Sequence, residues 1–324
     1  MIHIAVALLF QAAAGRSTDT TVTVPVGARL RLDNQGGDIT IRAWDRNQIR
    51  VQADHSSRSG VEVDVRGQVV EVSSRGRRGV AGLVDYTITV PATMAVEVGG
   101  MYAEISIEGV KASVKAQTLD GNITLKGGAE SVNLSTVNGR IDVSGARGRI
   151  ELHAVSDGVA ASDIQGDLVI ESVSGDIDLR RIDAKSVDAQ TISGTIVFEG
   201  RILDAGSYSF TTHSGDVTLA IPEASNAALT LSSASGEMNS SLALKAERET
   251  RRRHTYRLGS GSASVDVETF SGDLNLVRPG ELKARRVEKD GGANVKGKGH
   301  RRNREHDKDD PDKDQNQGDE REGN

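Results

Sequence analysis

Hydrophobic and polar residues alternate through most of the chain in one short phrase that recurs around a glycine. In residues 114–125, 132–143 and 168–179, apolar side chains occupy the positions seven and five before the glycine and two and four after it. Alternation with a period of two is typical of a strand that buries one face. The phrase therefore predicts two short strands that meet at a glycine corner, with their apolar side chains turned inward.

The spacing of the phrase predicts the architecture. It returns around Gly194, Gly215, Gly236 and Gly272, and most successive corner glycines are separated by about 17 to 21 residues. A unit of that length is too short to fold alone and suits one coil of a stacked solenoid. The sequence therefore predicts an all-β fold: a single-stranded parallel β-solenoid, similar to a β-helix, with two short strands in each coil.

Small polar residues accompany the corners in two columns. Three positions before the glycine we expect hydroxyl groups that bond backbone at the inner corner: Thr118, Thr136, Ser172, Thr191, Thr212, Ser233 and Thr269. A row of nucleophiles is the functional alternative, but no column of bases lies beside it. Directly before the glycine lie turn-forming residues, with glycine expected to supply a positive φ: Asp120, Asn138, Asp157, Ser174, Ser193, Ser214, Ser235 and Ser271.

A third column, directly after the glycine, is partly acidic. Its members are Asp38, Asn122, Arg140, Asp176, Thr195, Asp216, Glu237 and Asp273. We interpret them as exposed residues beside the turn. A calcium ladder is the alternative, but Arg140 and Thr195 interrupt the column, and the dense Gly-Gly-x-Gly-x-Asp turns of calcium-binding coils are missing. His153 and His213 have no partner at metal-ligand spacing, so the sequence predicts neither a metal site nor a cofactor.

The first 14 residues resemble a signal peptide. An apolar run from Ile4 to Phe10 precedes small residues ending at Ala14, although no Lys or Arg comes before the run. A truncated gene start or a buried first strand are the alternatives. No stretch is long enough to span a bilayer as a helix, so we expect no transmembrane span and an extracytoplasmic location: periplasm, cell surface or secreted.

The rest of the chain divides by pattern. Residues 20–98 break the short period and are interpreted as the N-terminal coils with a β cap, in which Trp44 packs; a carbohydrate-stacking platform is the alternative for Trp44. Residues 99–278 hold the solenoid repeats. Residues 281–324 are expected to be a disordered charged tail, because they have almost no large hydrophobic side chains.

The tail carries its charge in blocks. Residues 281–304 contain nine Lys and Arg against three Asp and Glu, and residues 305–324 contain three against nine. The basic half can contact an anionic envelope surface; the alternative is a solubilising tail without a partner.

Charge and cysteine content exclude several classes of protein. The formal net charge is −6, so the basic clusters at residues 75–78 and 251–254 do not indicate nucleic-acid binding. The run from Arg251 to His254 is the best candidate for contact with an anionic ligand, because it lies where one coil is lengthened. The chain has no cysteine, which excludes disulfides, thiolate metal sites and cysteine catalysis.

Several of these phrases together carry a resemblance. Residues 37–41 (Gly-Asp-Ile-Thr-Ile), residues 42–45 (Arg-Ala-Trp-Asp), the strand at Ile49, residues 89–91 (Thr-Val-Pro) and the serial Ser-Gly-Asp-Ile corners resemble the bacterial putative-adhesin family of β-strand-repeat proteins. The resemblance covers residues 20–277 and departs at Ala103 and at residues 158–161, where the corner phrase is degenerate. It implies a β-solenoid outside the cytoplasm, in a family of unknown function with no defined catalytic residues.

Two hypotheses for function follow. The first is a non-catalytic scaffold or adhesin whose sheet faces bind an envelope polysaccharide or a surface protein. The second is a β-helical polysaccharide lyase or hydrolase, which would need acidic residues from neighbouring coils to converge in a groove. No phosphate loop, nucleophile elbow or zinc signature is present. We therefore predict a protein that is not an enzyme and has no catalytic residues.

Overall fold

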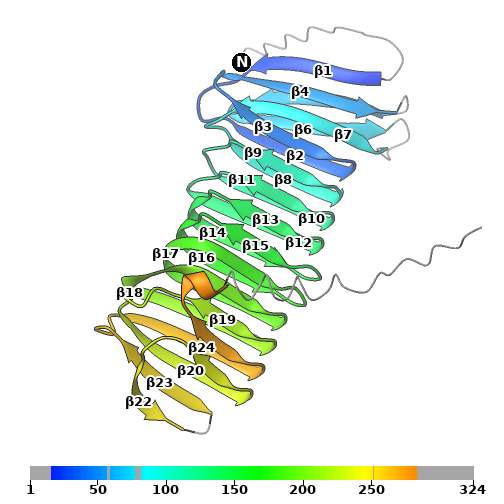
Figure 1. Cartoon of the computed structure of the whole chain (residues 1–324). Coiled ribbons are helices and arrows are strands. Elements are labelled where there is room, and N and C mark those ends of the chain that lie inside the picture. The colour runs from blue at the N-terminus through cyan, green and yellow to red at the C-terminus, as the bar shows by residue number, and fades with distance from the viewer. Residues whose placement is uncertain (1–15, 57–58, 77–81, 251, 283–324) are drawn as a thin grey trace, which may run out of the picture. The chain divides into compact units, whose positions relative to one another are not determined.

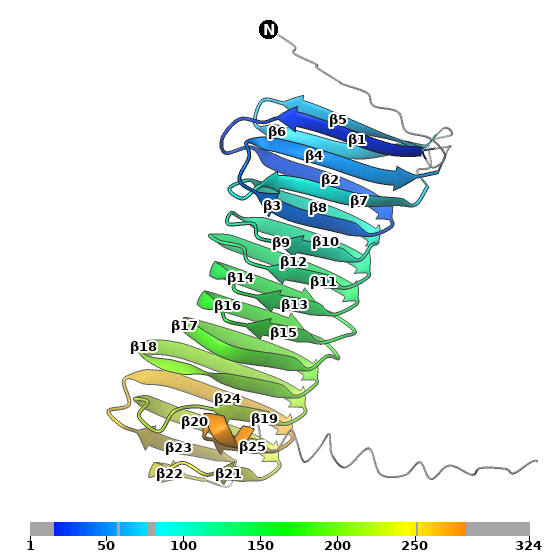
Figure 2. The same cartoon turned by 45° about the horizontal axis from the view of Figure 1, so that its top comes forward.

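The computed structural model describes residues 16–56, 59–76, 82–250 and 252–282, all of which belong to one compact unit, Met1–Lys283. These residues form one mixed 25-stranded sheet and a helical turn at residues 279–282. Figures 1 and 2 show the strands stacked as successive rungs. None of the helical residues described here makes a helix long and apolar enough to span a membrane. The predicted signal peptide lies outside the described residues.

Each rung has a strand before the glycine corner and a strand after it, which we call the first and second ladders. The first ladder contains β2 (Arg29–Gly36), β8 (Ala95–Tyr102), β10 (Val114–Asp120), β12 (Ser131–Asn138), β14 (Arg147–Ala154) and β16 (Gln165–Ser172). The second contains β3 (Ile39–Trp44), β9 (Ile105–Glu108), β11 (Ile123–Lys126), β13 (Ile141–Ser144), β15 (Val159–Ser162) and β19 (Val217–Ala220). The long strands β17 (Ile177–Ser193) and β18 (Ile196–Ser214) continue through both ladders.

One buried spine runs through the rungs, as predicted. Ile123 pairs with Ile141, and Ile177 pairs with Ile196, in parallel register. All four side chains are fully buried in one hydrophobic cluster that also contains the apolar residues of the neighbouring rungs. The alternation seen in the sequence therefore separates a continuous core from the solvent-facing side chains.

The expectation of a wholly parallel sheet is wrong at both ends. The remaining N-terminal strands are β1 (Arg16–Thr23), β4 (Gln48–His55), β5 (Ser59–Arg66), β6 (Val69–Gly76) and β7 (Val84–Pro91), and β1–β4, β4–β7 and β5–β6 are antiparallel pairs. At the other end, β23 (Arg253–Leu258) pairs antiparallel with both β20 (Ala227–Ser235) and β22 (Lys245–Glu249). Of these pairs, β5–β6 and β22–β23 join consecutive strands through short connections, which only antiparallel pairing allows. The other antiparallel pairs join strands that are not consecutive in the chain.

The order of the rungs in space departs from their order in the sequence at both ends. Near the N-terminus, β2 lies between β6 and β8, and β3 lies between β7 and β9. Near the C-terminus, β24 (Ala263–Ser271) lies between β18 and β20, and β25 (Leu274–Val277) lies between β19 and β21 (Met238–Ser240). The last rung of the chain is therefore inserted inside the stack (Figure 1).

The hydroxyl column has the structural role predicted for it. Thr136, Thr191 and Thr212 are buried, and each donates a hydrogen bond of 3.0 to 3.2 Å to the carbonyl oxygen of the corner glycine in the neighbouring rung. Ser172 instead accepts a bond from the amide of Gly175. These bonds satisfy backbone groups that the bend leaves outside the ladders.

At the corners where the repeat is well formed, close stacking favours glycine as much as backbone conformation does. Gly139 has a φ of 153°, as predicted, and a Cβ placed there would lie 2.1 Å from the carbonyl oxygen of Gly121. A Cβ on Gly175 would meet the carbonyl oxygen of Asp157 at the same distance, although Gly175 has no positive φ. Asp157 thus occupies the corner column, and the sequence alignment that placed Gly158 there is wrong by one residue.

The chain turns into a short helix after the last strand. Leu282 packs with Ala220 and Val277 in a second, small hydrophobic cluster, and Glu281 bonds to Arg278. Leu282, which the sequence assigned to the charged tail, therefore packs against the sheet, and Glu281 belongs to the helical turn. The rest of the predicted tail lies outside the described residues.

Candidate binding groove

A column of exposed apolar side chains follows the outer face of the first ladder, two positions before the corner. Its apolar members are Met101, Leu119, Val137, Val155, Val173, Ile192 and Phe270, each exposed over a third or more of its surface. The strand registers place them on successive rungs, with His213 between Ile192 and Phe270. Contiguous apolar surface of this kind marks a contact site more often than scattered exposed residues do.

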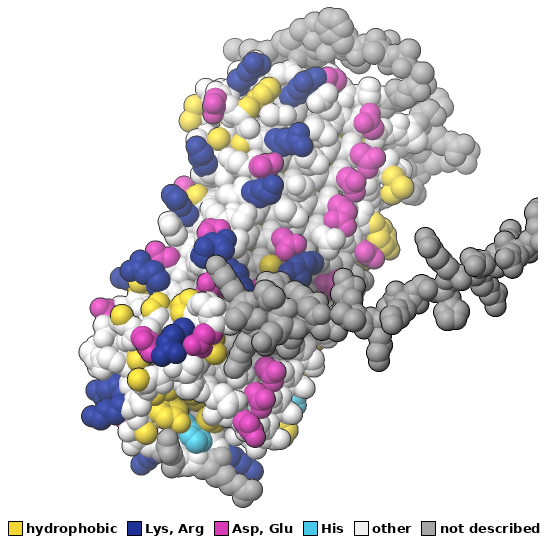
Figure 3. All heavy atoms as spheres, viewed as in Figure 1, with side chains coloured by type: hydrophobic (Ala, Val, Ile, Leu, Met, Phe, Trp, Pro, Cys, Tyr) yellow, Lys and Arg dark blue, Asp and Glu magenta, His cyan; other side chains and the backbone are white. Residues whose placement is uncertain are grey.

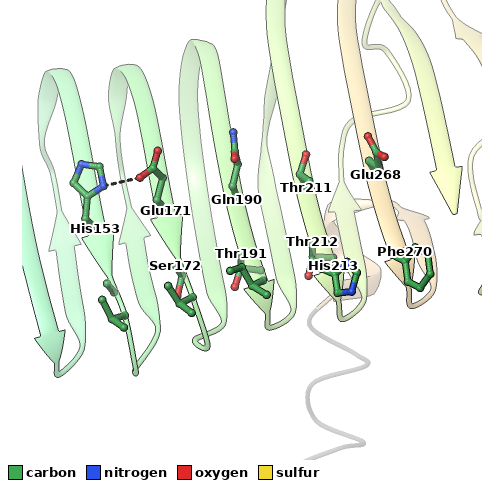
Figure 4. A pocket seen from close by; sticks show the side chains of 14 residues that line it. His153, Glu171, Ser172, Gln190, Thr191, Thr211, Thr212, His213, Glu268 and Phe270 are labelled. Carbon is green, nitrogen blue, oxygen red and sulfur yellow. Dashed lines mark hydrogen bonds and ion pairs between the residues drawn. The ribbon is translucent and has the colours of Figure 1, made fainter. Parts of the chain in front are cut away.

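The C-terminal half of this column forms one wall of a groove. A cavity of about 620 Å³ opens over β14, β16, β17, β18 and β24, bounded on one side by Val155, Val173, Ile192, His213 and Phe270. The opposite wall consists of the outward residues two positions earlier on the same strands: His153, Glu171, Gln190, Thr211 and Glu268. The groove therefore crosses the strands with an apolar side and a polar side (Figure 4).

The polar wall presents one functional group on each rung. His153 pairs with Glu171 through Nδ1 and a carboxylate oxygen 3.2 Å apart, and Glu171 lies beside Gln190 in register. Neighbouring strands in a sheet are about 4.8 Å apart, so donors and acceptors repeat at that interval along the groove. Figure 4 shows the side chains of Gln190, Thr211 and Glu268 continuing the row.

The inserted rung builds the aromatic end of the groove. Because β24 pairs with β18, Phe270 lies next to His213, and their rings stack with centroids 4.9 Å apart and planes 9° apart. Phe270 is 58 % exposed. If the rungs followed sequence order, the neighbour of His213 would be Ala234, two positions before Gly236, and no stacked pair would form.

The two carboxylates of the groove are too widely separated for glycoside hydrolysis. Glu171 lies on β16 and Glu268 on β24, with β17 and β18 between them. Three strand spacings give about 14 Å between their backbones, whereas paired catalytic carboxyl groups lie about 5 to 9.5 Å apart. Among the described residues, no group of three or more His, Asp and Glu could hold a metal ion. The groove thus has the features of a binding surface.

The partly acidic column predicted from the sequence lies at the corner edge, outside the groove. Asp176 accepts a 2.7 Å hydrogen bond from the amide of Thr195 in the next rung, and Asp216 accepts one of 2.8 Å from the amide of Asp273. The carboxylate oxygens of Asp176 and Asp216 thus satisfy backbone amides at the corner, which gives these members of the column a structural role. Figure 3 shows that acidic side chains also form rows on the face that it presents.

Of the other sequence candidates, Trp44 and the basic run from Arg251 lie apart from the groove, whereas the two histidines line it. The Trp44 indole donates to the carbonyl oxygen of Gln48 at 2.7 Å, and the Arg46 guanidinium covers its ring, so the alternative of a sugar-stacking platform gains no support there. Of the run from Arg251 to His254, Arg251 is outside the described residues, Arg253 and His254 begin β23, and His254 stacks on Tyr256. Of the two histidines considered as metal ligands, both line the groove, one on each wall.

Sequence reasoning missed the groove although a signal for it was present. The position two before the glycine reads Leu119, Val137, Val173 and Ile192 in well-formed repeats. In a strand, successive side chains point to opposite faces, so the residue after the buried hydroxyl must face solvent. An apolar residue at this exposed position breaks the expected alternation of apolar and polar residues. A repeated break of that kind indicates a surface kept apolar for contact.

Comparison with known proteins agrees with this architecture. The sequence model of one family, Toastrack DUF4097, matches residues 28–277. The chain belongs to the Toastrack DUF4097 family. No curated protein matches it.

Similar solved structures include three bacterial proteins. A putative adhesin from Parabacteroides merdae is 10 % identical with a TM-score of 0.42, and the match covers 81 % of this chain and 97 % of that one. A putative adhesin from Bacteroides fragilis is 12 % identical with a TM-score of 0.40 and the same two coverages. A putative cell adhesion protein from Clostridium sporogenes is 12 % identical with a TM-score of 0.26, covering 82 % of this Toastrack chain and 100 % of its own.

Proposed function

We propose that this protein is a non-catalytic scaffold that binds an envelope or surface polymer, or a surface protein, through the groove on the first ladder. The observation that carries the proposal is the juxtaposition of an exposed apolar column with a polar row across five adjacent strands. A concave surface with an apolar side and a few regularly placed polar groups is the usual form of a binding site. Because the strands share one continuous core, both walls are held in a fixed geometry.

The groove favours this function over the alternative of a polysaccharide lyase or hydrolase. A lyase acting on an acidic polymer needs cationic groups or a metal near the substrate carboxylate, and no Lys or Arg lines the groove. The spacing of Glu171 and Glu268 does not suit a hydrolase, as described above.

The surrounding segments have proposed roles of their own. Residues 1–14 direct export, which places the protein in the periplasm, at the cell surface or outside the cell. The antiparallel strands β4 and β5 within residues 20–98, together with β1 (Arg16–Thr23), cap the stack, and residues 99–278 form the repeat body. The basic surplus of residues 281–304 contacts anionic envelope surfaces.

Sedimentation of the full-length protein with isolated bacterial envelopes tests the binding function. Ile192 is 54 % exposed in the groove, and Leu119 is 44 % exposed in the same column but outside it. We expect Ile192→Asp to weaken sedimentation about tenfold, because it places a charge on the apolar wall, and Leu119→Asp to leave it unchanged. Equal sedimentation of the wild type and Ile192→Asp would contradict the proposal.

A further inference from the structure

The stacked pair of His213 and Phe270 places two exposed, nearly parallel rings at one end of the groove. The rings are nearly parallel, and Ile192 lies on the adjacent rung in the same column. Aromatic and aliphatic surfaces of this kind attract the C–H faces of a flat ligand, whose polar rim remains free for hydrogen bonds. A sugar ring has this combination of an apolar face and a rim of hydroxyl groups.

The polar wall suits a rim of hydroxyl groups. Gln190 supplies an amide oxygen as an acceptor, since its Nε2 already donates to Asp188 at 3.0 Å. Glu171 and Glu268 supply acceptors, and Thr211 supplies a hydroxyl. These groups recur once per rung, at an interval of about 4.8 Å. A polymer with one ring per rung meets both walls repeatedly.

The charge of the groove disfavours a polymer with regular charge of either sign. Its lining contains two Glu and no Lys or Arg, so a polyanion would be repelled. A polycation would find the two carboxylates three rungs apart, with Glu171 already paired to His153. An uncharged ligand avoids both costs.

The position of the groove disfavours an extended peptide. Peptides that bind sheets usually add a strand at an open edge, where backbone groups are free. Here the groove crosses the face of strands whose backbones are paired on both sides, as β18 is with β17 and β24. A peptide lying across them would leave its own amides without ladder partners.

We infer that the groove binds an uncharged glycan, whose chain runs along the stack with sugar faces on Ile192, His213 and Phe270 and hydroxyl groups on Glu171, Gln190 and Glu268. The inference rests on the proposed binding function and specifies its ligand.

Biolayer interferometry of the full-length protein tests the inference with four immobilised polymers: a β-glucan and a galactomannan, both uncharged, polygalacturonate and chitosan. We expect binding to at least one uncharged polymer and a Kd at least tenfold weaker in Phe270→Ala. The matched control is Tyr102→Ala, which removes an aromatic ring that is 58 % exposed outside the groove and should leave the Kd unchanged. Glu268→Gln keeps a hydrogen-bonding group without the charge and should change the Kd less than threefold.

Every other outcome overturns the inference. Binding to neither uncharged polymer, binding to polygalacturonate or chitosan alone, or uncharged-polymer binding that Phe270→Ala does not weaken would each do so. A large loss in Glu268→Gln would show a cationic ligand. If envelopes still sediment the wild type but not Ile192→Asp while the glycans fail, the ligand class is wrong and the binding function of the groove stands.

Discussion

The hydroxyl of Thr136 donates a 3.0 Å hydrogen bond to the carbonyl oxygen of Gly121 in the next rung. Thr136 is 1 % exposed, so this bond forms away from water and joins two rungs at their corner. The same relationship recurs from Thr191 to Gly175 and from Thr212 to Gly194. Side-chain bonds at the corners thus supplement the strand ladders in holding the groove's supporting rungs together.

Thr136→Val tests the contribution of one such bond. The substitution keeps the shape of the side chain but leaves a buried carbonyl oxygen without this partner, and we expect a loss of about 1 to 3 kcal/mol in the free energy of unfolding. Urea unfolding measures the loss. Thr124→Val, on the outer face of β11, is the control and should change stability by less than about 0.5 kcal/mol. Equal effects of the two substitutions would show that the hydroxyl contributes nothing.

Gly139→Ala tests whether close stacking, beyond backbone conformation, requires glycine. Its Cβ would lie 2.1 Å from the Gly121 carbonyl oxygen, so neighbouring rungs must separate, and we expect a loss of about 3 kcal/mol or more. Gly145→Ala is the matched control, because Gly145 has a φ of 70° but no atom within 4 Å of a Cβ. It should cost about 1 kcal/mol. Similar losses, measured by urea unfolding, would contradict the stacking argument.

Two substitutions of Asp216 test whether the acidic column has a structural role or binds calcium. Its carboxylate accepts a 2.8 Å bond from the Asp273 amide, which Asn can also accept. We therefore expect Asp216→Asn to keep the melting temperature and Asp216→Ala to lower it by a few degrees, corresponding to about 1 kcal/mol. Added calcium or a chelator should shift neither the wild type nor either variant. A calcium-dependent rise in melting temperature that Asp216→Asn abolishes would establish an ion site instead.

The buried side chain of Tyr86 should make the free energy of unfolding depend on pH in the alkaline range. Burial of this side chain raises its pKa from 10.0 to about 12. The folded state therefore holds the phenolic proton more tightly than the unfolded state does, so the stabilisation is complete below about pH 10 and is lost as the pH rises toward 12. Tyr86→Phe should remove this part of the decline.

Unfolding of the wild type and Tyr86→Phe at pH 8, 10 and 11.5 measures the effect. Between pH 8 and 11.5, the free energy of unfolding of Tyr86→Phe should rise relative to that of the wild type by an amount on the order of 1 to 2 kcal/mol. Tyr102→Phe, at an exposed side chain, should follow the wild type. If the difference in free energy of unfolding between the two proteins stayed constant from pH 8 to 11.5, the raised pKa of the buried Tyr86 would be contradicted.

The repeat body could be predicted from sequence because local and tertiary preferences agree there. Ile123 and Ile141 alternate with polar residues, face inward and succeed each other in register, so pattern alone identifies them. Insertion of β24 between β18 and β20 could not be predicted, since each of these strands carries the same repeat and pairing partners are chosen by long-range contacts. The position of Phe270 beside His213, and with it the aromatic end of the groove, follows from that insertion.

Double-cysteine trapping tests the central claim, that the inserted rung completes the groove. The natural chain has no cysteine, and Ser209 on β18 and Thr230 on β20 each pair with Asp266 on β24. Disulfides need Cα atoms about 4.4 to 6.8 Å apart, whereas strands two positions apart in a sheet lie about 9.6 Å from each other. After mild oxidation, the monomer carrying Ser209→Cys and Asp266→Cys should form an intramolecular disulfide, and the monomer carrying Ser209→Cys and Thr230→Cys should not. The reverse result would place the rungs in sequence order, separate Phe270 from His213 and contradict the groove.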